Sequence, residues 1–133
     1  MKPRLQEIVV DCHDPGSLAA FWGTLLGVRW ANRGDAWSVV DADPLLLAFQ
    51  QVPEPKSSPK NRLHLDIQVG DAAASVAAAT DAGARQLAEP VLDDGDGYVV
   101  MADPEGNEFC FVVDNRGGWA AGTRAALDAA GGH

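Results

Sequence analysis

The chain runs twice through the same order of expected secondary structure, and this repeat restricts its fold more than any other feature. In each half, a β-forming run precedes an aspartate, a helical segment and a glycine, and three more short β-forming runs follow. The first half covers about residues 4–52 and the second about 62–114. One β-α-β-β-β unit of this length cannot bury a curved sheet by itself, so we expect the two units to pack together.

Both expected helices begin at an aspartate and end at a glycine. Asp14 is a good N-cap, and Asp71 occupies the same place in the second half. Apolar residues then recur at helical spacing in the first half, as Leu18, Phe21, Trp22 and Leu25. The second helix is carried by the alanine-rich run 72–82. Gly27 and Gly83 are the expected stops.

The remaining segments complete the expected fold. We expect strands in the first half over 5–12, 28–30, 36–41 and 45–52, and in the second over 63–69, 84–87, 98–102 and 108–113. Three prolines and two serines make 53–61 a linker, and 119–130 is expected to form a short C-terminal helix. The sequence therefore predicts one α+β domain over residues 1–133.

Composition argues against several classes of partner. Hydrophobic residues make up 47% of the chain, which suits a packed core. The net charge of −9 does not suit a surface that binds phosphate groups. We therefore expect neither a nucleic acid nor a membrane as partner, and no signal peptide or membrane-spanning run is visible. Cys12 and Cys110 lack metal-type spacing and are expected to be small buried hydrophobes in a reduced cytoplasmic protein.

Aligning the two halves picks out candidate metal ligands. Counting back seven residues from each cap leads to Glu7 and His64, and matching the last strands places Leu47 at the position of Glu108. Two carboxylates and an imidazole suit Zn, Ni, Co, Mn or Fe(II), although a protein without metal remains an alternative. A shift of one residue in the first strand would turn Gln6 inward instead of Glu7.

Two motifs carry a family resemblance. With the paired modules, residues 60–66 (KNRLHLD) and 103–110 (DPEGNEFC) make the chain resemble the glyoxalase/bleomycin-resistance/dioxygenase, or vicinal oxygen chelate, superfamily, and within it the small glyoxalase-like domain proteins. The similarity covers about residues 5–113. It implies eight strands in a curved mixed sheet around a cup, with any metal held by Glu7, His64 and Glu108.

The resemblance also implies limits on the reaction. Glyoxalase I enzymes use four protein ligands, and Leu47 leaves this chain one short, so that water fills the gap or no metal binds. Extradiol dioxygenases and fosfomycin-modifying enzymes have two histidines and one glutamate. Glu7 stands where the first of these histidines would be, so both readings lose weight.

Functions of different classes remain open at this point. In the first, a metal-dependent lyase or isomerase polarises the carbonyl of a small oxygenated metabolite, and Glu7 or Glu108 abstracts a proton. In the second, a bleomycin-resistance-like protein sequesters a small molecule without metal. A third is a structural or regulatory domain with an empty cup, so whether the chain is an enzyme stays open. Superfamily members are commonly dimers, and we expect a homodimer. The candidate residues for an apolar cup wall are Trp37, Phe49, Tyr98 and Met101.

Overall fold

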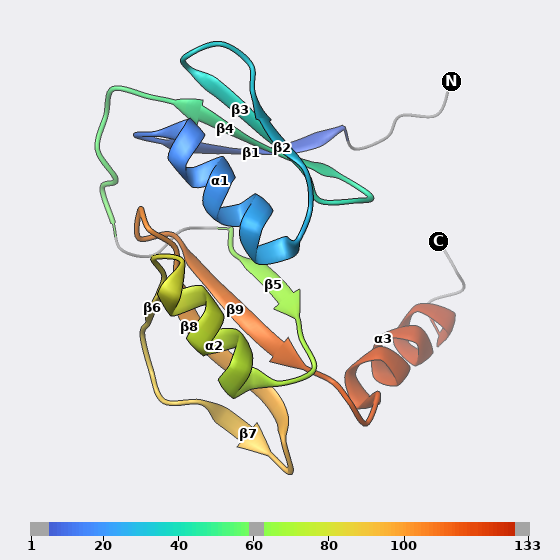
Figure 1. The fold of residues 1–133 in the computed structure, drawn as a ribbon. Helices are drawn as coiled ribbons and strands as arrows, with labels where there is room; N and C mark the ends of the chain where they lie inside the picture. The colour runs from blue at the N-terminus through green and yellow to red at the C-terminus, as the bar shows by residue number, and fades with distance from the viewer. Residues whose placement is uncertain (1–5, 59–62, 130–133) are drawn as a thin grey trace.

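A computed structural model describes residues 6–58 and 63–129 and shows a mixed α+β fold with two sheets (Figure 1). Each sheet carries a helix on one face, and the two halves of the chain form separate modules, as the repeat predicts. Lys60, Asn61 and Arg62, which belong to the motif before His64, lie outside the described residues, as does part of the linker.

The first module is a four-stranded sheet with the order β1-β4-β3-β2. β1 and β4 run parallel and the other neighbours are antiparallel. Its strands are β1 (Glu7–Cys12), β2 (Trp30–Asn32), β3 (Trp37–Asp41) and β4 (Leu46–Gln51). All four expected strands are present, although β2 begins two residues later than the start expected at residue 28.

The second module has five strands where four were expected. They are β5 (Leu65–Gln68), β6 (Arg85–Gln86), β7 (Val91–Asp93), β8 (Asp96–Ala102) and β9 (Glu108–Val113). The order is β5-β9-β8-β6, and β7 pairs with β8. The extra strand arises because Asp94 and Gly95 adopt positive φ angles of 52° and 85°, which closes a tight hairpin within the loop expected at 93–97.

The two central helices have the predicted caps. α1 (Pro15–Leu26) follows Asp14, whose Oδ1 accepts a hydrogen bond from the Ser17 backbone N–H at 3.2 Å, and ends at Gly27 with a left-handed φ of 68°. α2 (Ala72–Asp81) follows Asp71, whose Oδ1 accepts from the Ala74 N–H at 3.0 Å. The sequence prediction of both helices is confirmed.

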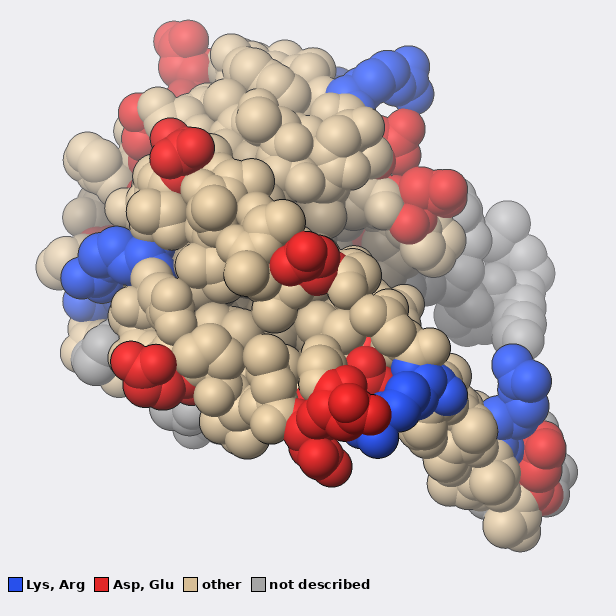
Figure 2. All heavy atoms as spheres, turned by 60° about the horizontal axis from the view of Figure 1, so that its bottom comes forward, with Lys and Arg blue, Asp and Glu red and all other residues tan. Residues whose placement is uncertain are grey.

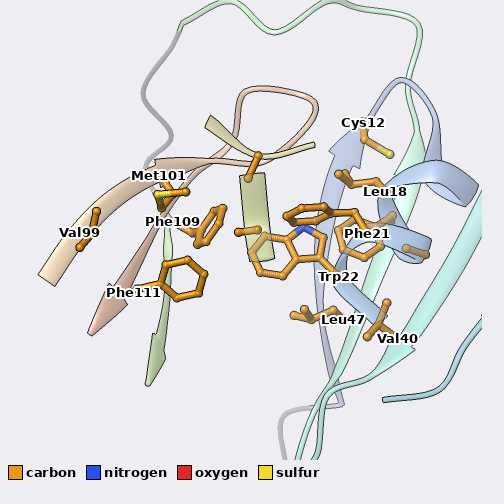
Figure 3. Packing of buried hydrophobic residues seen from close by; sticks show 14 residues of the cluster. Cys12, Leu18, Phe21, Trp22, Val40, Leu47, Val99, Met101, Phe109 and Phe111 are labelled. Carbon is orange, nitrogen blue, oxygen red and sulfur yellow. The ribbon is translucent and has the colours of Figure 1, made fainter. Parts of the chain in front are cut away.

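The hydrophobic core is shared between the modules. Phe21 and Trp22 on α1 reach across to the second sheet, where the rings of Trp22 and Phe109 pack edge to face with centroids 4.9 Å apart (Figure 3). Phe109 in turn packs against Phe111 at 5.4 Å. α1 of the first module therefore buries its apolar side against both sheets, and Trp22 is a core residue.

None of the described helices packs along the opposite face of either sheet, and we call this face the open face. On β9, Phe109 and Phe111 point into the core, so Glu108 and Cys110 alternate with them toward the open face. The third helix, α3 (Gly118–Ala129), projects away from the body at the end of β9 (Figure 1). None of the described helices is long and apolar enough to cross a bilayer.

Charged side chains are spread over the surface without a basic patch on the face that Figure 2 shows. Acidic groups are distributed over this face of the described residues, and the few Lys and Arg side chains mostly stand beside acidic ones. Arg29 and Asp41 form an ion pair at 3.0 Å.

Candidate functional site

The three predicted metal ligands lie at strand starts on the open face. Glu7 and Glu108 are the first residues of β1 and β9, and His64 directly precedes β5. The residues that follow Glu7 and His64, Ile8 and Leu65, pack against the core, so Glu7 and His64 point the other way. The alternative register, with Gln6 inward, does not occur.

His64 and Glu108 are neighbours across two parallel strands. Leu65 on β5 pairs with Phe109 on β9, and His64 and Glu108 each come one residue before these partners. Both line a cavity of about 310 Å³ between β5 and β1, the edge strands of the two sheets. An imidazole and a carboxylate therefore meet where the two modules adjoin.

A second set of donor atoms surrounds His64. Asp66 lies two residues further along the chain, and Cys110 is the direct partner of Asp66 on β9. One ligand atom from each of His64, Asp66 and Cys110 lies within 4.8 Å of the others, and His64 Nε2 is 3.3 Å from Asp66 Oδ1. Over residues 6–58 and 63–129, this is the one set of three or more such groups at that spacing. An imidazole, a carboxylate and a thiol together are a donor set that fits a divalent metal ion.

Glu7 is outside this set. It is half-buried on β1 and pairs with Leu46 of β4. The register also corrects the alignment of the two halves. Val10 occupies in the first half the position of Ile67 in the second. Val10 pairs with Phe49 and Ile67 pairs with Phe111, so Phe49 corresponds to Phe111.

The residue equivalent to Glu108 is therefore Leu46. The prediction of Leu47 at this position was wrong by one, because Leu47 is buried with the core. The conclusion that an apolar residue stands at the fourth position is unchanged.

The predicted cup wall divides between the two faces. Tyr98 lies on the open face, beside Val112, and Trp37 lies on the open face of the first sheet. Met101 is fully buried in the core near Phe109 (Figure 3), so its assignment to the cup wall is corrected. Phe49 is also a core residue on the helix side of β4, but it reaches the inner end of the 310 Å³ cavity.

A larger cavity of about 710 Å³ lies on the open face of the second sheet, where α3 begins. Its wall includes Asp66, Gln68, Tyr98, Val112 and Trp119. Because Asp66 also belongs to the donor set around His64, this cavity adjoins that set at Asp66.

The acidic groups at the rim of this cavity are held by the turn that leads into α3. The Asp96 carboxylate accepts hydrogen bonds from the backbone N–H groups of Asn115 and Arg116 at 3.1 and 3.0 Å. These bonds, together with the nearby Arg116 guanidinium, lower the pKa of Asp96. The Asp114 carboxylate accepts from the N–H groups of Trp119 and Ala120 and so caps α3. Of the cavity's charged side chains, Asp66 is the one directed to the metal ligands.

Sequence reasoning assigned no site role to Cys110 or Trp119. Cys110 was expected to be buried, yet it is half-exposed on the open face, whereas Cys12 is buried as expected. The alternation of β9 contained the signal, because Cys110 is two residues from Glu108. For Trp119 no sequence signal existed, since its place depends on the turn after β9.

Comparisons with known proteins agree with this architecture. The family model described as "Glyoxalase-like domain" matches residues 7–112. No curated protein gives a significant match.

Several solved structures share the fold. A glyoxalase/bleomycin resistance protein/dioxygenase family enzyme from Burkholderia phytofirmans has 18% identity and a TM-score of 0.66, over 81% of this chain and 96% of its own. A glyoxalase-related enzyme from Fulvimarina pelagi has 18% identity and a TM-score of 0.67, over 83% of this chain and 87% of its own.

A mutant of the fosfomycin resistance protein FosX from Listeria monocytogenes, complexed with Mn(II) and 1S,2S-dihydroxypropylphosphonic acid, has 13% identity and a TM-score of 0.66, over 84% of this chain and 90% of its own. At these identities the similarity establishes the fold. Because the family model covers most of the chain and the two-module architecture agrees with it, this protein belongs to the glyoxalase-like domain family.

Proposed function

We propose that the protein is a metal-dependent lyase or isomerase that acts on a small oxygenated metabolite. The observation that carries this proposal is the position of His64, which shares one cavity with Glu108 and lies within 4.8 Å of two further donor groups. The FosX structure with Mn(II) supports it, because it places a divalent cation in a protein of this fold.

Residues of the chain would both bind the metal and transfer the proton. His64, with Glu108 and Glu7, is the predicted ligand set, and a bound divalent ion supplies Lewis acidity toward a substrate carbonyl. A carboxylate from Glu7 or Glu108 takes the proton next to that carbonyl. Both glutamates are half-buried, which limits competition from bulk water for that proton.

The substrate would bind at His64 and Glu108, which line the 310 Å³ cavity, and extend toward the 710 Å³ cavity beside Asp66. Tyr98, Val112 and Trp119 give the 710 Å³ cavity its apolar surface, and the charged groups that line this cavity are mainly carboxylates. Arg116, the cavity's basic side chain, forms ion pairs with Asp94 and Asp96 at 3.8 and 3.3 Å. These features, with the net charge of −9, favour a small neutral substrate over a polyanion.

Metal binding by the purified chain tests this function. After removal of metal with a chelator, dialysis against Zn(II), Co(II) or Mn(II) should leave about one ion per chain. His64→Gln should abolish the binding, and the matched variant His13→Gln should not, because the exposed His13 lies outside the donor set. Wild-type protein that retains no metal would refute the enzymatic proposal.

A metal-free binding protein is the second candidate, favoured by the apolar part of the same cavity. Tyr98 and Trp119 expose aromatic surface there, as a protein that sequesters small aromatic compounds would. In the presence of chelator, the neutral dye Nile red should then bind with increased fluorescence, and Trp119→Ser should weaken it. Binding unaffected by Trp119→Ser would contradict a role of this cavity.

We further propose a cytoplasmic homodimer. In the part of the chain that the structure describes, no disulfide joins Cys12 and Cys110, which suits a reducing compartment. Trp119 and Leu127 on α3 are largely exposed, and large exposed apolar side chains are typical of interfaces. Light scattering on a sizing column should give twice the chain mass of 14.0 kDa, and a monomer mass at every concentration would exclude the dimer.

A further inference from the structure

We propose that Cys110 is a metal ligand and that His64, Asp66 and Cys110 form a site with one thiolate donor, selective for Zn(II) and Co(II) over Mn(II). The inference rests on the proposed metal dependence and extends it by naming a different donor set and the preferred ion. The set of Glu7, His64 and Glu108 contains only hard oxygens and one imidazole, so the two sets predict different metal preferences.

The backbone holds the three donors on one surface. Asp66 and Cys110 are direct partners in the parallel ladder of β5 and β9, so their side chains stand side by side on the open face. His64 is two residues before Asp66 and therefore on the same face. The core residues Leu65 and Phe109 fix this register from the other side of the sheet.

The donor atoms are near the separations that a zinc site requires. With bonds of about 2.0–2.3 Å, tetrahedral ligand atoms stand about 3.3–3.8 Å apart. His64 Nε2 and Asp66 Oδ1 are already 3.3 Å apart, and all three ligand atoms lie within 4.8 Å. The side chains of His64 and Asp66 are 53% and 57% exposed, so rotation about their χ angles can close the remaining distance. Three protein ligands would leave a fourth position for water or substrate, and Asp66 also lines the 710 Å³ cavity.

The chemistry of the thiol decides which ion fits. A thiolate is a soft donor that Zn(II) and Co(II) accept, while Mn(II) prefers oxygen ligands. Cys12 does not compete for metal. It lies in the core on the helix side of β1, and burial, reinforced by the nearby carboxylate of Glu105, raises its pKa to about 12.

The experiment uses the full chain, freed of metal by a chelator and titrated with Co(II), Zn(II) and Mn(II). Co(II) should produce the near-ultraviolet absorption of a thiolate-to-cobalt charge transfer, and Zn(II) should displace it. Cys110→Ser should abolish that band and weaken Zn(II) binding at least about 100-fold, since even loss of an outer partner of a ligand costs 10–100-fold. Asp66→Asn should weaken Zn(II) binding without removing the band.

Two controls separate ligand loss from misfolding. Cys12→Ala should keep the cobalt band, and His13→Gln should leave Zn(II) affinity unchanged. In wild-type protein, a thiol reagent should label Cys110 without metal and fail to label it with Zn(II), which requires no variant.

The outcomes distinguish this inference from the proposed function. If Cys110→Ser binds Zn(II) as wild type does while His64→Gln does not, the thiolate site is wrong and a metal site at His64 stands. Tighter binding of Mn(II) than of Zn(II) would likewise exclude the thiolate set. If wild-type protein binds none of the three ions, both proposals fail, and the proximity of His64 to Asp66 is a surface contact only.

Discussion

Asp103 is the most constrained polar residue in the core. It is 3% exposed and accepts four hydrogen bonds, from the Trp22 indole N–H, the Glu105 N–H, and the backbone and side-chain N–H groups of Asn107. Burial nevertheless raises its pKa, because the carboxylate loses its water. The Trp22 contact connects α1 of the first module to the turn between β8 and β9.

Asp103→Asn should destabilise the protein by about 2–4 kcal/mol. Each oxygen of the Asp103 carboxylate accepts two hydrogen bonds. The amide nitrogen that replaces one oxygen in the variant would lose both of that oxygen's bonds, and its N–H groups would face the former donor N–H groups in a buried site. Urea unfolding followed by fluorescence measures the change. Asp35→Asn, at an exposed turn, is the matched control and should stay within about 0.5 kcal/mol of wild type.

At the scale of elements, the start of α1 is stabilised from both modules. Asp14 caps the helix with its own carboxylate. The Glu105 carboxylate of the second module accepts hydrogen bonds from the backbone N–H groups of His13 and Asp14, at 2.7 and 2.8 Å. Negative charge at a helix N-terminus is favourable, so these carboxylates anchor α1 between the sheets.

Asp14→Ala should cost about 1 kcal/mol at neutral pH, and the cost should shrink in acid. Hydrogen bonds from Ser17 lower the pKa of Asp14 below its ordinary 3.8. A carboxyl with a lowered folded pKa stabilises above the unfolded value, and this contribution is lost as pH falls through the folded value. Urea titrations of both proteins at several pH values test this. A difference that grows in acid would contradict it.

Gly23→Ala should destabilise the protein by about 1–3 kcal/mol despite the better helix propensity of alanine. A Cβ at Gly23 would overlap the Trp30 indole, with which α1 packs against β2. Gly122→Ala on α3 is the control, because nothing lies within 4 Å of its Cβ position. Thermal unfolding should show a lower midpoint for the first variant and no loss for the second.

At the scale of the whole molecule, a shared hydrophobic core joins the two modules. Phe21 and Trp22 from the first half pack against Phe109 from the second, so each half covers part of the apolar surface of the other. The sequence predicts one domain, and this packing predicts in addition that the two halves of the domain unfold together.

Unfolding in urea should therefore follow a single transition. Tryptophan fluorescence reports on all four tryptophans, of which Trp22 lies in the shared core, and far-ultraviolet circular dichroism reports on all elements. We expect the two curves to coincide. Separate midpoints would mean that the modules unfold independently, and would contradict the role of the shared core.

The sequence by itself determined the repeat, the caps at Asp14 and Asp71, and the stop at Gly27, because these depend on hydrogen bonds and dihedral angles within a few residues. It also determined that Glu7, His64 and Glu108 stand at strand starts. Only the tertiary structure decided the register of β4 against β1, which moved the fourth position from Leu47 to Leu46. Strand register depends on contacts between distant segments, and a shift of one residue reverses every side chain.

The same reason explains the other corrections at the site. Met101 proved to be core and Cys110 proved to face the open side, since packing against the helices chose which alternate residues of β8 and β9 were buried. The alternation along the strand already placed Asp66 on the same face as His64, whereas the grouping of both with Cys110 became visible only once β5 and β9 were paired.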